Sequence, residues 1–210
     1  LGFKKGLKRW NYYKAILLIN PDTYFDRYLF KNGINTLFLE KDIGACSPKI
    51  LYSDGRIWWV ESRHLSVKEI VLGLNYDITK HINQREKDFY VKGTFEANLL
   101  TGCALFIKTD AIKKVGLFDE NYFMYVEDID YCLRLKKHSY KLFMFNNSKV
   151  YHAKDQNIEI SRLEIRREYI SLISTGKYVL KNYPIYIFIA WLIKLPLVIF
   201  FKVLRRYQII

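Results

Sequence analysis

The residues with the clearest potential for chemistry are two adjacent carboxylates, Glu127 and Asp128, at the predicted start of a helix. Adjacent carboxylates repel each other, and a helix N-terminus tolerates them because its unpaired N–H groups and its dipole favour negative charge. One interpretation is therefore structural, with the pair serving as helix-capping and first-turn residues. The other is that one carboxylate stays ionised in a cleft and accepts a proton from a substrate hydroxyl, as a general base does.

A second candidate group follows a short apolar run. Residues 14–20 fit a buried strand that ends at Pro21, because proline lacks a backbone donor. Ligands of open α/β sheets bind beyond the carboxyl ends of the strands, so we expect Asp22 at a site-forming edge. A carboxylate there is suited to a divalent cation that bridges phosphate oxygens. Asn20, Pro21 and Asp22 are also ordinary turn residues, and the tetrapeptide taken alone favours that structural interpretation.

A histidine, His152, follows the strand-like residues 149–151. A lone histidine after a strand is more often structural than a metal ligand. Next to a carboxylate, however, its imidazole would complete a site for Mg²⁺ or, with a better match of ligand type, Mn²⁺.

The pattern along the chain predicts a scaffold for these residues. We predict strands at 14–20, 49–53, 56–60, 102–108 and 141–145, with Asp54 and Gly55 forming a hairpin turn. We predict helices near 66–73, over 111–115 with Thr109 or Asp110 as cap and Gly116 as end, and from 128 to about 137. Strands that alternate with helices indicate an α/β layered domain.

The C-terminal part differs from the rest in charge and hydropathy. Residues 158–181 predict an amphipathic helix, the only charged residue from 185 to 201 is Lys194, and no acidic residue follows Glu168. As a helix the apolar stretch would be roughly 26 Å long, against a hydrocarbon core of about 30 Å, and basic residues flank it on both sides. We therefore expect an interfacial or re-entrant helix, with a true span and a buried core helix as alternatives.

The overall composition limits the classes of binding partner that we expect. A formal net charge of +13 favours an anionic partner, which would be nucleic acid, phospholipid headgroups or a phosphorylated small molecule. The basic residues do not gather with aromatic ones in a nucleic-acid-binding motif, so we expect no nucleic-acid partner and keep such a domain as an alternative only. The three cysteines are odd in number and far apart, which predicts reduced thiols in a cytosolic compartment.

Three segments together resemble glycosyltransferase family 2, in particular its rhamnosyltransferase-like branch. They are ILLINPDTY (16–24), TGCALFIKTDAIKKVGLFDENYFMYVEDIDYCLRLKKHSYKLF (101–143) and KVYH (149–152). The resemblance implies a GT-A-like, Rossmann-like mixed sheet flanked by helices over residues 1–155, followed by a helical, membrane-associated tail over 156–210. Family members carry nucleotide-binding strands before the position of Gly2, so we expect this catalytic core to be N-terminally truncated.

The resemblance also implies which residues bind the sugar donor and the metal. Asn20 and Asp22 take the place of the Asp-X-Asp-type motif that binds the nucleotide diphosphate and the metal, with Asp22 as the metal ligand. His152 would be a second ligand, and the cofactor would be Mg²⁺ or Mn²⁺. Thr101 and Gly102 would line the sugar pocket.

The implied activity is inverting sugar transfer in cell-surface polysaccharide synthesis. Asp128 would be the general base, with Glu127 beside it. The donor would be a nucleotide-diphosphate sugar, rhamnose being the branch's usual sugar, and the acceptor a hydroxyl of a glycan or lipid-linked glycan at the cytoplasmic face of an anionic membrane. The alternative within this resemblance is a catalytically inactive fragment that serves as a membrane or assembly module.

Overall fold

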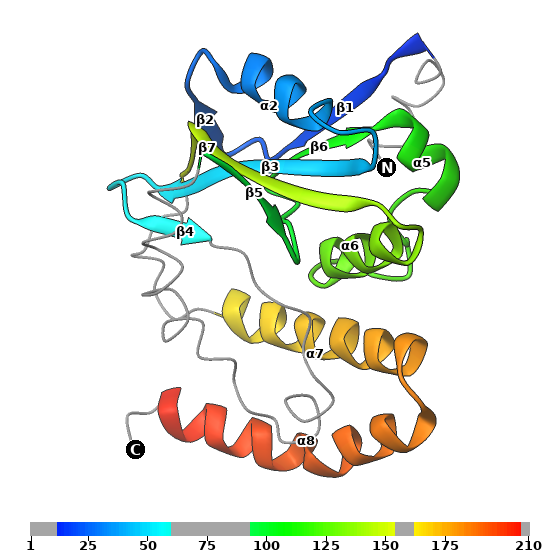
Figure 1. Cartoon of the computed structure of the whole chain (residues 1–210). Helices are drawn as coiled ribbons and strands as arrows, with labels where there is room; N and C mark the ends of the chain where they lie inside the picture. The colour runs from blue at the N-terminus through cyan, green and yellow to red at the C-terminus, as the bar shows by residue number, and fades with distance from the viewer. Residues whose placement is uncertain (1–11, 60–92, 154–161, 207–210) are drawn as a thin grey trace. The chain divides into compact units, whose positions relative to one another are not determined.

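The structure is a computed structural model that describes residues 12–59, 93–153 and 162–206 (Figure 1). These residues fall into two compact units. The first, here called the sheet unit, comprises the described residues up to 59, 93–119 and 127–153; the second, here called the helical unit, comprises 120–126 and 162–206. The helix predicted near 66–73 lies outside the described residues.

The described part of the sheet unit forms one seven-stranded mixed sheet. Five strands lie in the order β1 (Ala15–Ile19), β6 (Ala104–Lys108), β3 (Ile43–Tyr52), β7 (Lys141–His152) and β2 (Thr23–Phe25). In addition, β4 (Ile57–Trp59) pairs with β3, and β5 (Thr94–Ala97) pairs with β7. Only β3 and β7 run parallel, and the other pairs are antiparallel. The predicted mixed α/β architecture is thereby confirmed.

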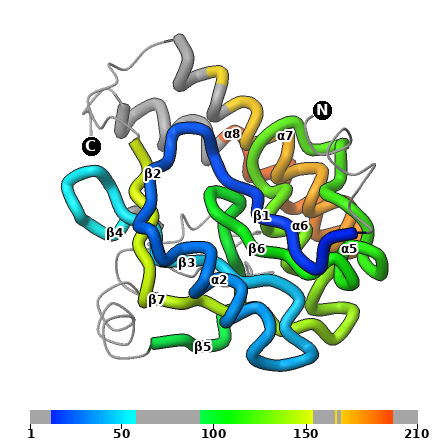
Figure 2. The backbone as a smooth tube through the Cα atoms, turned by 90° about the horizontal axis from the view of Figure 1, so that it is seen from above, coloured from blue at the N-terminus to red at the C-terminus, as the bar shows by residue number. Residues whose placement is uncertain are grey.

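Helices cover both faces of this sheet (Figures 1 and 2). Helix α2 (Leu29–Leu37) packs on one face, and α5 (Thr109–Val115) with α6 (Glu127–Lys137) packs on the other. Strand β6 shows why, because its side chains alternate: Leu105 and Ile107 join the core under α5 and α6, whereas Phe106 joins the core under α2. A continuous apolar run is what a strand buried on both faces requires.

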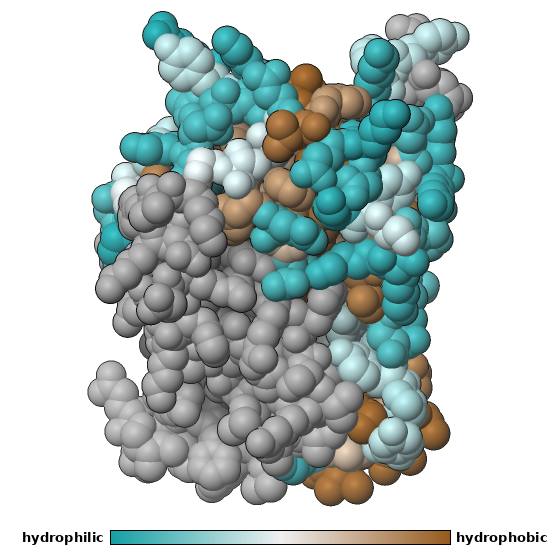
Figure 3. All heavy atoms as spheres, viewed as in Figure 1, coloured by the Kyte–Doolittle hydropathy of each residue, from teal (hydrophilic) through white to brown (hydrophobic). Residues whose placement is uncertain are grey.

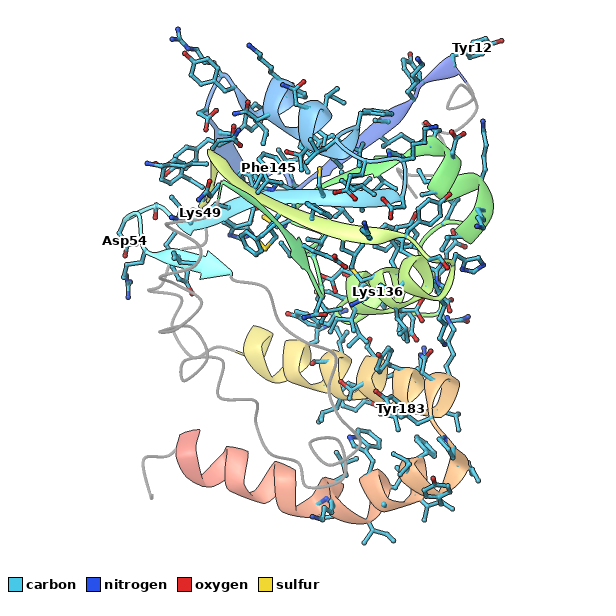
Figure 4. All side chains as sticks on the ribbon, viewed as in Figure 1. Tyr12, Lys49, Asp54, Lys136, Phe145 and Tyr183 are labelled. Carbon is cyan, nitrogen blue, oxygen red and sulfur yellow. The ribbon has the colours of Figure 1, made fainter. Side chains whose placement is uncertain are left out.

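The central strands are longer than predicted. Strand β3 begins six residues before the expected Lys49 and contains Pro48, where its register against β7 shifts. Proline cannot donate to a strand ladder, so it occurs at such irregularities. The hairpin to β4 turns at Asp54 and Gly55 as predicted, with Gly55 at φ +86°, and Asp54 is labelled at this turn in Figure 4. Phe145, labelled on β7, lies in the core with its ring 6.1 Å from that of Phe106.

Two predictions about local structure were wrong. Helix α5 begins at Thr109 with Lys108 as its N-cap, and no side chain caps it, so neither Thr109 nor Asp110 has the predicted capping role. The Thr109 hydroxyl donates to the Tyr13 carbonyl instead. The helix does end at Gly116, whose φ of +84° favours glycine. The prediction of strands was also incomplete, because β5 lies outside every predicted strand.

The helical unit contains the long helices α7 (Arg162–Asn182) and α8 (Ile185–Arg206). They pack around Val179 and Ile187, and Trp191 lies so close to Gly176 that a Cβ there would come within 3.1 Å of the indole. Within the part of the chain that the structure describes, no helix meets the length and apolarity that a membrane crossing requires.

The segment 120–126 belongs to the helical unit through polar contacts with α7. The buried Ser174 hydroxyl donates to the Met124 carbonyl at 2.8 Å, and the Lys177 ammonium donates to the Asn121 carbonyl at 2.7 Å. These bonds satisfy backbone acceptors of a segment that forms no regular element of its own.

Candidate active site

The turn after β1 lies against the turn before β6. Ile19 pairs with Ala104, and beyond this pair the Asn20 N–H donates to the Cys103 carbonyl at 2.9 Å. The Thr23 hydroxyl closes the first turn by donating to the Asn20 carbonyl at 2.7 Å. The predicted donor-binding residues Asn20 and Asp22 therefore flank the segment that contains the predicted sugar-pocket residues.

The structure brings Asp22 and His152 together. Strand β2 pairs with the end of β7 so that Thr23 faces His152, and the Ala153 N–H donates to the Asp22 carbonyl at 2.8 Å. The His152 Nε2 atom lies 3.5 Å from Asp22 Oδ2. The imidazole is almost fully buried, whereas about half of the carboxylate side chain is exposed, at 52%. The sheet thus holds the histidine in place, while the aspartate can reach a ligand.

This pair fits a divalent cation that is shared with a substrate. It offers one carboxylate and one imidazole, and no group of three or more potential His, Cys, Asp or Glu ligands gathers among residues 12–59, 93–153 and 162–206. Mg²⁺ typically binds through one or two carboxylates together with phosphate oxygens and water, and imidazole suits Mn²⁺ as well. Two protein ligands beside an open face are therefore compatible with a cation that a diphosphate helps to hold.

Asp128 also contacts the 101–103 turn. Its carboxylate accepts the Gly102 N–H at 3.2 Å through Oδ2 and the Ile129 N–H at 2.9 Å through Oδ1. Burial raises the pKa of this carboxyl, and the two backbone donors oppose that shift without cancelling it. Our expectation from the sequence that a helix start favours the ionised form therefore omits burial, which acts in the opposite direction.

The 101–103 turn is the common partner of both candidate groups. The Cys103 carbonyl binds the turn that carries Asp22, and the Gly102 N–H binds Asp128. Thr101 is buried, and its hydroxyl accepts the Cys103 N–H at 3.3 Å, which shapes the turn. Gly102 has no side chain, and among the described residues a Cβ there would meet only the Asp128 Cβ, at 3.9 Å, so these residues leave space beside the Asp128 carboxylate.

The environment of Glu127 disfavours the charged form of its carboxyl. Its Oε2 atom is buried and has no hydrogen-bond partner among the described residues, and burial, followed by the charge of Asp128, raises the pKa of its carboxyl. The two preceding residues, Tyr125 and Val126, have φ values of 66° and 70°. A β-branched residue in this region is strained, and such strain persists where the surroundings over-determine it, often at functional sites.

Asp130, the third acid of the same motif, has a structural role that the sequence analysis missed. It is fully buried and accepts Arg134 Nε at 2.8 Å, and the Arg134 guanidinium also donates to the Val115 carbonyl at 3.0 Å and the Leu117 carbonyl at 2.8 Å. The pair of Asp130 and Arg134 thereby connects helix α6 to the end of helix α5. Its (i, i+4) spacing is the signal that could have identified it.

The cysteines are free and buried, as the reduced thiols predicted from the sequence would be. Burial, followed by the negative charge of Asp22, raises the pKa of the Cys103 thiol to about 12. Burial likewise raises the pKa of the Cys132 thiol to about 12, and its sulfur accepts the Leu100 N–H at 3.3 Å. Thiols with such pKa values are not nucleophiles at neutral pH.

The chain matches no protein-family model, and it matches no curated protein sequence.

Proposed function

We propose that the sheet unit is the catalytic core of a GT-A-type inverting glycosyltransferase. Such an enzyme needs a general base and a diphosphate-binding group on opposite sides of one reacting carbon. The observation that carries the proposal is that one turn, 101–103, contacts both: its Cys103 carbonyl binds the Asn20 N–H next to Asp22, and its Gly102 N–H binds Asp128. The residues that share this turn lie far apart in the sequence, so the fold, and not local spacing, supports their common site.

Asp128 is the proposed general base. It takes the proton of an acceptor hydroxyl while that oxygen forms a bond to the anomeric carbon, and the bond between this carbon and the diphosphate oxygen breaks with its electron pair leaving on the diphosphate. One such displacement inverts the anomeric centre. The raised pKa of the Asp128 carboxyl favours this role, because a base works best when its pKa approaches the operating pH.

Asp22 and His152 are the proposed holders of the leaving diphosphate. When bound, Mg²⁺ or Mn²⁺ would neutralise the negative charge that develops on the leaving group. The buried imidazole of His152 orients toward Asp22 at 3.5 Å, and the exposed half of Asp22 faces outward to meet the donor. Asn20 contributes by fixing the turn through its N–H, and Thr101 with Gly102 leaves room for the sugar.

The proposed acceptor is a glycan or lipid-linked glycan at the cytoplasmic face of the cell membrane. The helical unit supports a membrane partner, because it leaves large apolar side chains exposed and its chain carries six basic and no acidic residues after Glu168. Anionic headgroups attract such a surface, and apolar side chains enter the headgroup boundary.

Sugar transfer by the full chain tests this proposal. Release of nucleoside diphosphate from a panel of nucleotide sugars is measured with Mn²⁺ or Mg²⁺ and a glycolipid acceptor, and donor binding is measured separately by calorimetry. We expect Asp22→Asn to weaken metal-dependent donor binding and Asp128→Asn to leave it nearly unchanged while transfer is lost. Asp110→Asn, at an exposed carboxylate on α5, is the matched control. Metal-dependent donor binding without transfer would favour the inactive module, and no donor binding at all would overturn the proposal.

A further inference from the structure

Helices α7 and α8 enclose an open groove of about 350 Å³ within the helical unit. Its walls include Leu172, Ile173 and Leu180 on α7 and Phe188, Trp191 and Leu195 on α8. Cavities that bind small ligands span roughly 300 to 1,000 Å³, so this groove has the size for one narrow ligand. Close contact between Gly176 and the Trp191 indole brings the aromatic ring into the floor of the groove.

The lining selects a hydrocarbon ligand. Among the described residues that line the groove, Lys177 is the only charged one, and its ammonium already donates to the Asn121 carbonyl at 2.7 Å. Tyr169, which is 64% exposed, offers a hydroxyl, but the leucine, isoleucine and phenylalanine side chains of the walls offer no hydrogen bond, so a polar ligand would lose most of its hydrogen bonds to water without replacing them. An alkyl chain has no such bonds to lose, and its burial is favourable in proportion to the apolar area removed from water.

The surroundings of the groove indicate where that chain comes from. Figure 3 shows apolar side chains gathered at the surface around the first half of α8, where Ile185, Ile189 and Ile193 are all exposed and Ile193 is 72% exposed. A helix that is apolar on all sides needs a partner surface. All six charged residues after Glu168 are basic, so a partner with both hydrocarbon and negative charge complements this unit.

We propose that the groove receives one acyl chain of an anionic phospholipid when the helical unit lies on a bilayer. The inference rests on the proposed membrane partner and not on sugar transfer. The exposed isoleucines of α8 enter the interface, the basic residues contact the headgroups, and one lipid chain bends into the groove and contacts Trp191. A second copy of the chain or a partner protein on the same surface would instead exclude lipid from it.

Fluorescence of Trp191 tests the proposal directly. The chain has four tryptophans, so replacing Trp10, Trp58 and Trp59 by phenylalanine in the full chain leaves Trp191 as the only reporter. The probe is a vesicle of phosphatidylcholine and phosphatidylglycerol in which only the phosphatidylglycerol carries brominated acyl chains, because bromine quenches tryptophan on contact. We expect strong quenching with these vesicles and none when the bromine is absent.

A pair of isoleucine variants distinguishes insertion of a lipid chain into the groove from membrane binding by exposed side chains outside it. Ile173 lines the groove and is 41% exposed, whereas Ile189 is 49% exposed and does not line it. Ile173→Asn should remove most of the quenching at saturating lipid, and Ile189→Asn should weaken vesicle binding roughly tenfold yet leave saturating quenching intact. Far-UV circular dichroism of both variants checks that the helices persist.

Each result decides between the occupants. If vesicles bind and quenching is equal in both variants, or if the parent chain binds vesicles without quenching, no lipid chain enters the groove. The proposed membrane partner would still hold. Absence of vesicle binding would overturn both. If the chain forms dimers in sedimentation experiments and dimer formation competes with vesicle binding, the surface binds a second copy of the chain. None of these measurements uses a sugar donor, so failure of the transferase proposal remains distinct.

Discussion

The two units differ in the size of the apolar core that their described residues form. In the sheet unit buried apolar side chains form two clusters, one on each face of the sheet, although other large ones, such as Phe30 and Leu39, stay exposed. In the helical unit the described core consists of Val179 and Ile187 with a few partly buried neighbours, while many large apolar side chains of α7 and α8 stay exposed. The first arrangement has a large apolar core, whereas the described part of the second has a small core beside exposed apolar side chains of the kind that mark interaction surfaces.

This difference predicts that the two units can be disabled separately. Asp128→Asn should lower transfer by about 10²- to 10⁴-fold, the usual contribution of a general base, while vesicle binding stays the same. Ile193→Asp should do the reverse, abolishing vesicle binding without changing donor affinity, because a charge at the apolar surface opposes insertion. Transfer assays, calorimetry and vesicle sedimentation on both variants make the measurement. Loss of both functions in either variant would refute their independence.

The acid side of the pH–rate profile provides a second test of the sheet unit. A general base acts in its ionised form, so transfer should fall about tenfold per pH unit below the pKa of Asp128. Because burial raises that pKa, the decline should begin above the ordinary aspartate value of 3.8. Turnover under saturating donor is the measurement, with vesicle binding followed over the same pH range. An acid limb at the ordinary value would assign the base to a solvated carboxyl elsewhere.

Charge pairs in the sheet unit differ greatly in their predicted contribution to the free energy of unfolding. Asp130→Ala should cost about 3 kcal/mol of unfolding free energy, because it leaves the largely buried Arg134 without its 2.8 Å partner. Asp110→Ala, which breaks an exposed 3.4 Å contact with Lys113, should cost less than about 0.5 kcal/mol. Urea midpoints of both variants test the contrast, and similar costs would mean that α6 does not depend on its buried pair.

Sequence patterns were informative where burial alone decides the structure. Strands β1 and β6 are apolar except for Lys108, and their positions were predicted within one or two residues. Helix α2, LFKNGINTL, was missed because its glycine and two asparagines are weak helix formers, and it depends on packing Leu29 and Leu37 against the sheet. Strand β7 continues through the polar residues 146–148, where its register against β3 shifts, and the paired residues on either side of this irregularity keep it within one strand.

The candidate site was predictable by residue type and not by geometry. Asp22, Asp128 and His152 could be selected because carboxylates and a histidine follow predicted strands or begin a helix. Nothing in local spacing indicates that the Gly102 N–H reaches Asp128 or that Thr23 pairs opposite His152, since both depend on long-range registers. The raised pKa of Asp128 was likewise inaccessible, because burial is a property of the fold.

A smaller effect concerns the polar contact inside the helical unit. Ser174→Ala removes the buried hydroxyl that donates to the Met124 carbonyl and should lower the unfolding free energy by about 1 kcal/mol. Thr175→Ala is the neighbouring control, because the Thr175 hydroxyl bonds only to the Ser171 carbonyl of its own helix among the contacts seen here, and alanine favours a helix. Urea titration gives both values. An equal response would show that segment 120–126 does not depend on Ser174.

The smallest expected effect is a gain in stability at Glu127. Burial raises the pKa of this carboxyl in the folded chain above its ordinary value of 4.5, so the folded state retains a proton that the unfolded state has lost. Stability therefore falls as pH rises from about that value through the folded pKa, and the ionised group, with Oε2 unpartnered, is destabilising at neutral pH.

Glu127→Gln removes this charge and should add a few tenths to about 1 kcal/mol at pH 7, with the gain vanishing in acid, where glutamic acid is itself neutral. Glu96→Gln, at an exposed position on β5, should show no such pH-dependent gain. Urea midpoints measured from acid to neutral pH for both variants decide the matter. A loss of stability in Glu127→Gln would mean that the ionised carboxylate is held by a donor, and the sheet unit would then tolerate no unpaired buried charge beside its proposed base.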